Sequence, residues 1–268
     1  MFFLVFSSLW AARHHIADVV RKAFGRGEDI DDAGELVSYR TAVFGFLAAS
    51  VFAVLWLIDN GLGPGSALFY YLLCIVTFVG LARIVSQAGL AYGVSPVAPP
   101  VFIVTALGPD MLGPSGLTAL GMNFPWSADL RTFVMASAAT GLKIAEVTRL
   151  EGRRLFLAIV AAILATLVSA TWAVMTLAYK YGGINLGGWG FGGLTQLTGD
   201  WIAYNINNAE DVYGWHLAYT GIGGVVMAIL TYIKTRFIGF PIHPIGLALG
   251  LTYPISTIWF SVFLAWLF

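Results

Sequence analysis

Arg83 and Gln87 are the polar residues best placed to bind a solute, because they interrupt a long apolar run. The run covers residues 66–87, and the two side chains are four residues apart. On a helix that spacing puts both on one face. A guanidinium binds carboxylates and phosphates through paired hydrogen bonds, so Arg83 predicts an anion contact with Gln87 beside it. The alternative is an arginine that reaches from the inner end of its helix to the membrane surface.

Lys143 and Glu146 form a second candidate pair, three residues apart in the stretch GLKIAE at 141–146. One interpretation is an exposed helix pair, which stabilises an isolated helix by about 0.2–0.5 kcal/mol. The other is a polar contact at the inner mouth of a cavity, with Glu146 accepting a proton. The residue pattern favours the exposed pair. A role of the two residues at the inner mouth of a cavity remains the alternative hypothesis.

Asp110 and His243 are the candidate proton carriers. Asp110 is the charged residue within the proline-rich stretch 96–126. A carboxylate there carries a coupling proton if burial favours its neutral form; otherwise it caps a short helix or faces water. His243, in the stretch FPIHPIG, either relays protons near neutral pH or belongs to a turn locked by the flanking prolines.

The remaining reactive residues indicate neither an enzyme nor a metal site. The single cysteine, Cys74, lies in an apolar run, and the four histidines fall in three separate regions without a metal-binding spacing. No serine–histidine–aspartate or cysteine–histidine arrangement is visible. We therefore expect no catalytic residues, no metal and no cofactor. A net charge of zero without a basic stripe excludes nucleic acid as a partner.

The composition requires a lipid environment for these residues. Of 268 residues, 59% are hydrophobic and 10% charged, too few charges to cover a water-exposed surface. The fold class predicted is all-α, a polytopic transmembrane bundle in a single domain over 1–268, with five to six spans and a re-entrant segment. The expected spans are 41–58, 66–87, 155–178, 217–233 and 245–268, with 2–12 as the tail of a preceding span.

Basic residues orient the spans, because cytoplasmic loops are enriched in lysine and arginine. This rule makes 13–40 a cytoplasmic loop and 181–215 an extracytoplasmic glycine-rich loop of a multi-pass protein of the cell (inner) membrane. Segment 94–140 must then leave and return to the cytoplasmic side. Its short apolar pieces are broken by prolines, so we expect a re-entrant hairpin or broken helices, with a long cytoplasmic loop as the alternative.

Several stretches also resemble a known transporter family. They are GLKIAE at 141–146 with the arginines of 149–154, FPIHPIG at 240–246 leading to WFSVFLAWL at 259–267, SYRTA at 38–42 and LARIV at 81–85. Together they are similar to the oligopeptide transporter family and to prokaryotic proteins of unknown function related to it. The resemblance implies a larger transporter of small peptides or metal chelates, usually coupled to protons, with this chain as its C-terminal half or a fragment. The chain departs from that family in having too few spans, and in ending where the prokaryotic group continues with basic residues and another helix.

The sequence thus predicts proton-coupled secondary transport of small peptides or related small solutes. Arg83 and Gln87 are expected to bind the substrate, Lys143 and Glu146 to line the inner gate, and Asp110 or His243 to handle the proton. The expected partners are the lipid bilayer, the solute, and the missing half of the transporter or a second copy. The alternative is a structural membrane subunit that does not itself transport.

Overall fold

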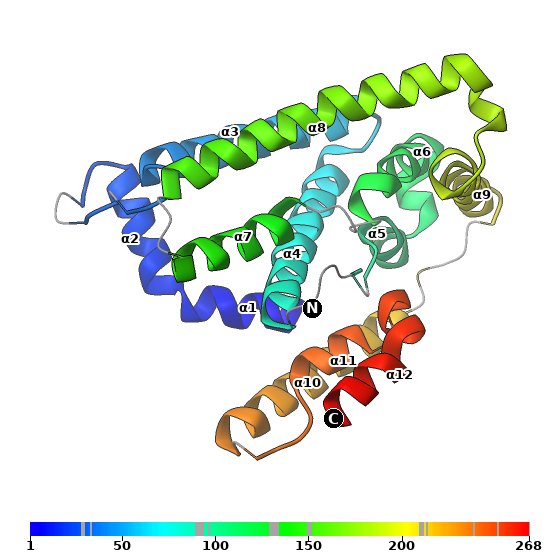
Figure 1. Ribbon diagram of the computed structural model, residues 1–268. Coiled ribbons are helices and arrows are strands. Elements are labelled where there is room, and N and C mark those ends of the chain that lie inside the picture. Colours follow the sequence, from blue (N-terminus) through cyan, green and yellow to red (C-terminus); the bar gives the residue numbers. More distant parts are fainter. Residues whose placement is uncertain are drawn as a thin grey trace.

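A computed structural model gives the arrangement of the chain (Figure 1). It describes residues 1–27, 30–32, 34–88, 94–95, 97–128, 134–148, 152–208, 212, 214–237, 239–250 and 252–267. These residues form helices and connecting turns, with no strand among them. The helices are α1 (Phe2–Ala11), α2 (Arg13–Ala23), α3 (Tyr39–Asp59), α4 (Pro64–Ala88), α5 (Pro99–Leu107), α6 (Pro109–Ser127), α7 (Val134–Thr148), α8 (Gly152–Tyr181), η2 (Gly183–Asn185), η3 (Trp189–Gly193), α9 (Leu194–Asn207), α10 (Gly214–Arg236), α11 (Pro244–Leu249) and α12 (Tyr253–Leu267).

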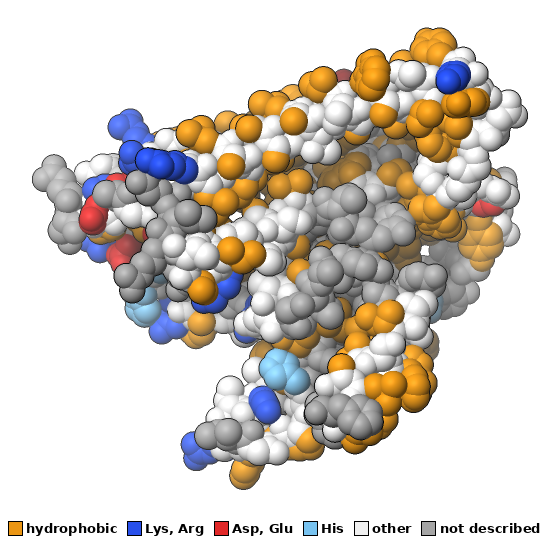
Figure 2. All heavy atoms as spheres, in the orientation of Figure 1, with side chains coloured by type: hydrophobic (Ala, Val, Ile, Leu, Met, Phe, Trp, Pro, Cys, Tyr) orange, Lys and Arg blue, Asp and Glu red, His pale blue; other side chains and the backbone are white. Residues whose placement is uncertain are grey.

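Four helices are long and apolar enough to cross a membrane, namely α3, α4, α8 and α10. They correspond to the first four spans expected from the sequence. The apolar stretches of α3, α8 and α10 are almost entirely exposed, whereas half of the stretch in α4 is buried. Figure 2 shows hydrophobic side chains along the outer side of α8. In water this surface would be unfavourable, but lipid chains cover it without cost.

The fifth expected span, 245–268, is not one continuous helix. The described chain there forms the short helix α11, a break around Thr252, and then α12. Pro254 is the second residue of α12. Proline lacks a backbone N–H and clashes with the preceding turn, so it is tolerated in the first turn of a helix and disrupts an interior. The helix therefore starts again at Tyr253, with the proline in its first turn.

The expected re-entrant segment, 94–140, contains two helices that meet at Gly108. Helices α5 and α6 pack against each other, and Gly108 joins them with φ 80°. A second glycine, Gly113, interrupts α6 with φ 65° and ψ 170°, a conformation essentially restricted to glycine. The broken helices expected from the prolines are therefore present. Their depth in a membrane stays a prediction.

Two segments expected to be loops contain helices. The segment 181–215 includes α9, which packs against α6, and the glycine-rich part before it forms the short turns η2 and η3. The segment 13–40 begins with α2, which packs against α3. The basic residues at the start of 13–40 are consistent with a helix there. Helix α9 is too short and too polar to resemble a span, so a search for long apolar runs misses it.

The buried core lies between α4 and the broken helices. Tyr70 and Cys74 of α4 pack with Ile103 of α5 and Leu120 of α6, and all four are nearly inaccessible. The Trp126 ring lies edge-on to Tyr70. Figure 1 shows α4 in the middle of the molecule, and it contacts α1, α3, α5 and α7. A polar residue on the last turns of α4 is therefore held by a well-packed support.

Candidate functional site

Arg83 lies on the last turns of α4 and ties that helix to α1. Its Nη1 donates a hydrogen bond of 2.6 Å to the carbonyl oxygen of Leu4 and contacts the hydroxyl of Ser8. A longer bond of 3.3 Å reaches the hydroxyl of Ser7. The side chain is half-buried, so it does not simply extend into the surroundings. The acceptors come from about 75 residues earlier in the chain, and nothing in the spacing of Arg83 indicated them.

Gln87 follows one helical turn after Arg83, as the four-residue spacing predicts. The Nε of Arg83 donates to Oε1 of Gln87 over 3.3 Å. Two of the guanidinium nitrogens are therefore engaged by neighbours, and this fixes the plane of the group. The Gln87 side chain itself is exposed. Its amide N–H groups remain donors, since the bond to Arg83 uses only the oxygen.

Arg83 and Gln87 line a cavity of about 370 Å³ whose other walls come from distant parts of the chain. The volume is within the range of about 300–1,000 Å³ that is usual for small-molecule sites. The cavity lies between α1, α4, α10 and the start of α11. Its lining residues are Leu4, Arg83, Gln87, Thr231, Lys234, Thr235, His243, Pro244 and Ile245. The structure thus brings His243 to the two residues expected to bind the solute.

His243 caps the first turn of α11 and faces the same cavity. Its Nδ1 accepts a hydrogen bond of 3.2 Å from the backbone N–H of Ile245, and Pro244 follows as the first helical residue. A ring nitrogen that accepts a bond carries no proton, so the neutral ring has its proton on Nε2. The structure shows the proline turn and places His243 in the lining of the cavity, whereas its role as a proton relay stays a prediction.

Lys234 is the cavity residue that sequence reasoning missed. It lies in the last turn of α10. Its Nζ donates a hydrogen bond of 2.8 Å to the carbonyl oxygen of Phe240, at the turn before α11. Thr231 and Thr235 line the cavity with it at helical spacing. The sequence shows that these three residues share one face of a helix. It does not show that this face lies opposite His243, which only the structure reveals.

Two other expected site residues, Asp110 and Lys143, do not join this cavity. Asp110 is exposed in the first turn of α6, where a carboxylate interacts favourably with the helix N-terminus. Lys143 is exposed on α7. The side chain of Glu146 lies outside the described part of the chain. Neither Lys143 nor Asp110 is among the residues that line the Arg83 cavity.

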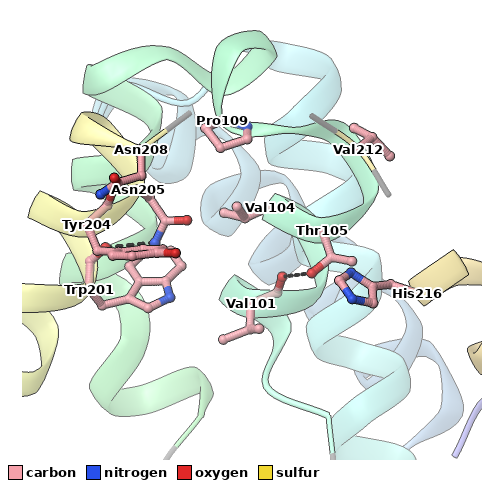
Figure 3. Close-up of a pocket in the computed structure, with 10 residues that line it drawn as sticks. All are labelled: Val101, Val104, Thr105, Pro109, Trp201, Tyr204, Asn205, Asn208, Val212 and His216. Carbon is pink, nitrogen blue, oxygen red and sulfur yellow. Dashed lines mark hydrogen bonds between the residues drawn. The ribbon is translucent and has the colours of Figure 1, made fainter. Parts of the chain in front are cut away.

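A second pocket, of about 130 Å³, lies between α5, α9 and the start of α10 (Figure 3). Figure 3 shows Trp201 and Asn205 of α9 across from Thr105 of α5, with His216 of α10 at the edge. No charged side chain is among its described lining residues. Asn205 donates to the carbonyl of Trp201 in its own helix. Across the described chain, no three histidine, cysteine or acidic residues gather to hold a metal.

The four long apolar helices and their exposed apolar surfaces define a helical membrane protein. Within that class, the whole chain, residues 1–268, matches a family described as a family of unknown function (DUF6785), and the chain belongs to this family. Among curated proteins and among solved structures, no match to the chain is found. The description of the family carries no activity, so the resemblance to oligopeptide transporters stays a prediction.

Proposed function

We propose that this protein takes part in proton-coupled secondary transport of small anionic solutes, small peptides among them, across the inner membrane. The observation that carries the proposal is the cavity that Arg83, Gln87, Lys234 and His243 share. Ionisable residues inside membrane-spanning segments are costly and often mark a solute or ion path. The resemblance to the oligopeptide transporter family supports the same class of function.

Arg83 and Gln87 bind the solute in this proposal, and His243 handles the proton. Protonation of Nδ1 removes the acceptor for the N–H of Ile245, so it loosens the first turn of α11. A positive imidazolium and a bound anion also stabilise each other. Proton and solute therefore favour each other's binding, which promotes their transport together.

The broken helices supply the elements that could move. The chain breaks at Gly108 and Gly113 on one side of α4, and again between α11 and α12. Interrupted helices of this kind build binding sites near the middle of the membrane in secondary transporters. Lys143 and Glu146 remain proposed for the inner gate, and Asp110 remains a second candidate for the proton.

The test is uptake by purified protein in liposomes, with a labelled pool of small peptides. Uptake is measured with an inward proton gradient, without a gradient, and with the gradient collapsed by a protonophore. We expect accumulation that depends on the gradient, and loss of accumulation when unlabelled solute competes. Well-folded protein that accumulates nothing under any gradient would remove peptide–proton symport.

The surface of α8 favours a structural subunit as the second possibility. None of the described residues of this thirty-residue helix is buried, so most of its surface is available to pack against lipid or another membrane chain. A subunit of a larger complex would co-purify with that partner after mild extraction. Isolated protein that is stable and active in liposomes would speak against this role.

A further inference from the structure

The Arg83 cavity contains two positive charges and, among its described lining residues, no acidic side chain. Arg83 comes from α4 and Lys234 from α10, so the two cations stand on different helices. We propose that the solute bound here is a dicarboxylate, or a peptide with an acidic side chain, with one carboxylate for each cation. This inference rests on the proposed function, in which the cavity binds the transported solute.

Neutral acceptors hold both cations in place without neutralising them. Arg83 donates to the Leu4 carbonyl, to the hydroxyls of α1 and to Gln87, while Lys234 donates to the Phe240 carbonyl. Arg21 and Asp18 on α2, by contrast, form an ion pair over 3.7 Å. A cation that is half removed from water gains most from a full negative charge. The cavity is therefore built to receive anions, and one carboxylate would leave a positive charge uncompensated.

Hydrogen-bonding capacity also points to a ligand made of acceptors. In the described part of the chain, no hydrogen bond uses Nη2 of Arg83, and Lys234 uses one of its three N–H groups. His243 offers its Nε2 proton and Gln87 its amide group. Thr231 and Thr235 donate to carbonyls of their own helix. Donors thus come from three sides of the cavity, and carboxylate oxygens accept such bonds.

The size of the cavity favours two separated charges over one compact dianion. A volume of about 370 Å³ is far larger than a single phosphate group, and the cations belong to different helices. We therefore expect two carboxylates joined by a short chain to pair with both cations. A monocarboxylate of the same length brings a single negative charge to the two cations.

The test is equilibrium binding to the detergent-solubilised full chain, measured by isothermal titration calorimetry with succinate, butyrate and inorganic phosphate as probes. Three proteins are compared: wild type, Lys234→Gln, and Arg236→Gln as the matched control. Arg236 is exposed two residues further along α10 and does not line the cavity. We expect succinate to bind wild type at least tenfold more tightly than butyrate. Lys234→Gln should weaken succinate at least tenfold and butyrate less than threefold, and Arg236→Gln should change neither.

Equal affinity for succinate and butyrate would overturn the proposal, and so would an unchanged succinate affinity in Lys234→Gln. Binding of phosphate but not succinate would overturn it as well, in favour of a compact dianion. If Lys234→Gln does not fold, Lys234→Arg replaces it, and this variant should keep the preference for succinate. Binding needs no proton gradient, so the binding and uptake assays test the two proposals separately. Dicarboxylate binding without uptake would refute the proposed transport but not the dicarboxylate site. Uptake without a preference for succinate over butyrate would refute the dicarboxylate site but not transport.

Discussion

Replacing Arg83 with glutamine separates two roles of this side chain, binding the solute and tying α4 to α1. A hydrogen bond to a charged group contributes about 1.5–3 kcal/mol. At about 1.4 kcal/mol for each factor of ten, losing the bond to a solute carboxylate weakens solute affinity about 10- to 150-fold. We therefore expect Arg83→Gln to lose nearly all uptake at a solute concentration that half-saturates wild type.

The fold should survive this substitution, because the Leu4 carbonyl does not lose every partner. The hydroxyls of Ser7 and Ser8 also donate to that oxygen, at 2.9 Å and 2.7 Å. No buried acceptor is left unsatisfied, so the loss of stability stays near about 1–3 kcal/mol. The variant should therefore purify as a folded protein with a lowered unfolding temperature.

Ser8→Ala is the matched control, because it removes one contact between Arg83 and α1 but keeps the guanidinium. The assay pairs uptake into liposomes with thermal unfolding in detergent for both variants. We expect Ser8→Ala to lose about 1 kcal/mol of stability and to keep most of its uptake. Equal loss of uptake in the two variants would refute solute binding by Arg83 and leave it the role of a structural tie.

Three other predictions follow from the structure. His243→Asn keeps a side-chain acceptor at the cap of α11, but asparagine cannot titrate near neutral pH. We therefore expect gradient-driven accumulation of solute to disappear while downhill exchange continues. Accumulation that persists in this variant would exclude His243 as the proton carrier. Gly113→Ala should lower the free energy of unfolding by about 1–3 kcal/mol in a denaturation assay, because the positive φ of this residue is unfavourable for alanine even though the space around it is open. Gly141→Ala on α7 is the control, and it should be neutral or stabilising in the same assay. Single cysteines placed at Arg26 and Gly187 should react with a membrane-impermeant maleimide from the cytoplasmic and the outer side, respectively, and the reverse pattern would invert the predicted orientation.

Local properties of the sequence were sufficient to predict the four long helices. A helix of about 20 apolar residues satisfies its own backbone hydrogen bonds and needs no partner, so length and hydropathy identify it. The same holds for the pairing of Arg83 with Gln87, which follows from 3.6 residues per turn. The prolines and glycines around Gly108 likewise indicated broken helices, since these residues act on the chain immediately next to them.

Tertiary packing decided what the local pattern could not. Helix α9 is too polar to be found by its hydropathy and is positioned by its contact with α6. The fifth expected span has the composition of a membrane helix, yet it breaks before Pro254. Whether an apolar run with a proline inside it kinks or stops depends on the helices around it, and sequence alone does not specify them.

By itself, the sequence determined that this is an all-helical membrane protein and that Arg83, Gln87 and His243 are polar residues of an apolar chain. Only the tertiary structure decided that these three share one cavity with Lys234, across more than 150 residues of intervening chain. The physical reason is that hydropathy and helical spacing act over a few turns, whereas a cavity is made by packing between helices distant in sequence. The same packing left Asp110 and Lys143 outside the cavity, although their residue types had suggested comparable roles.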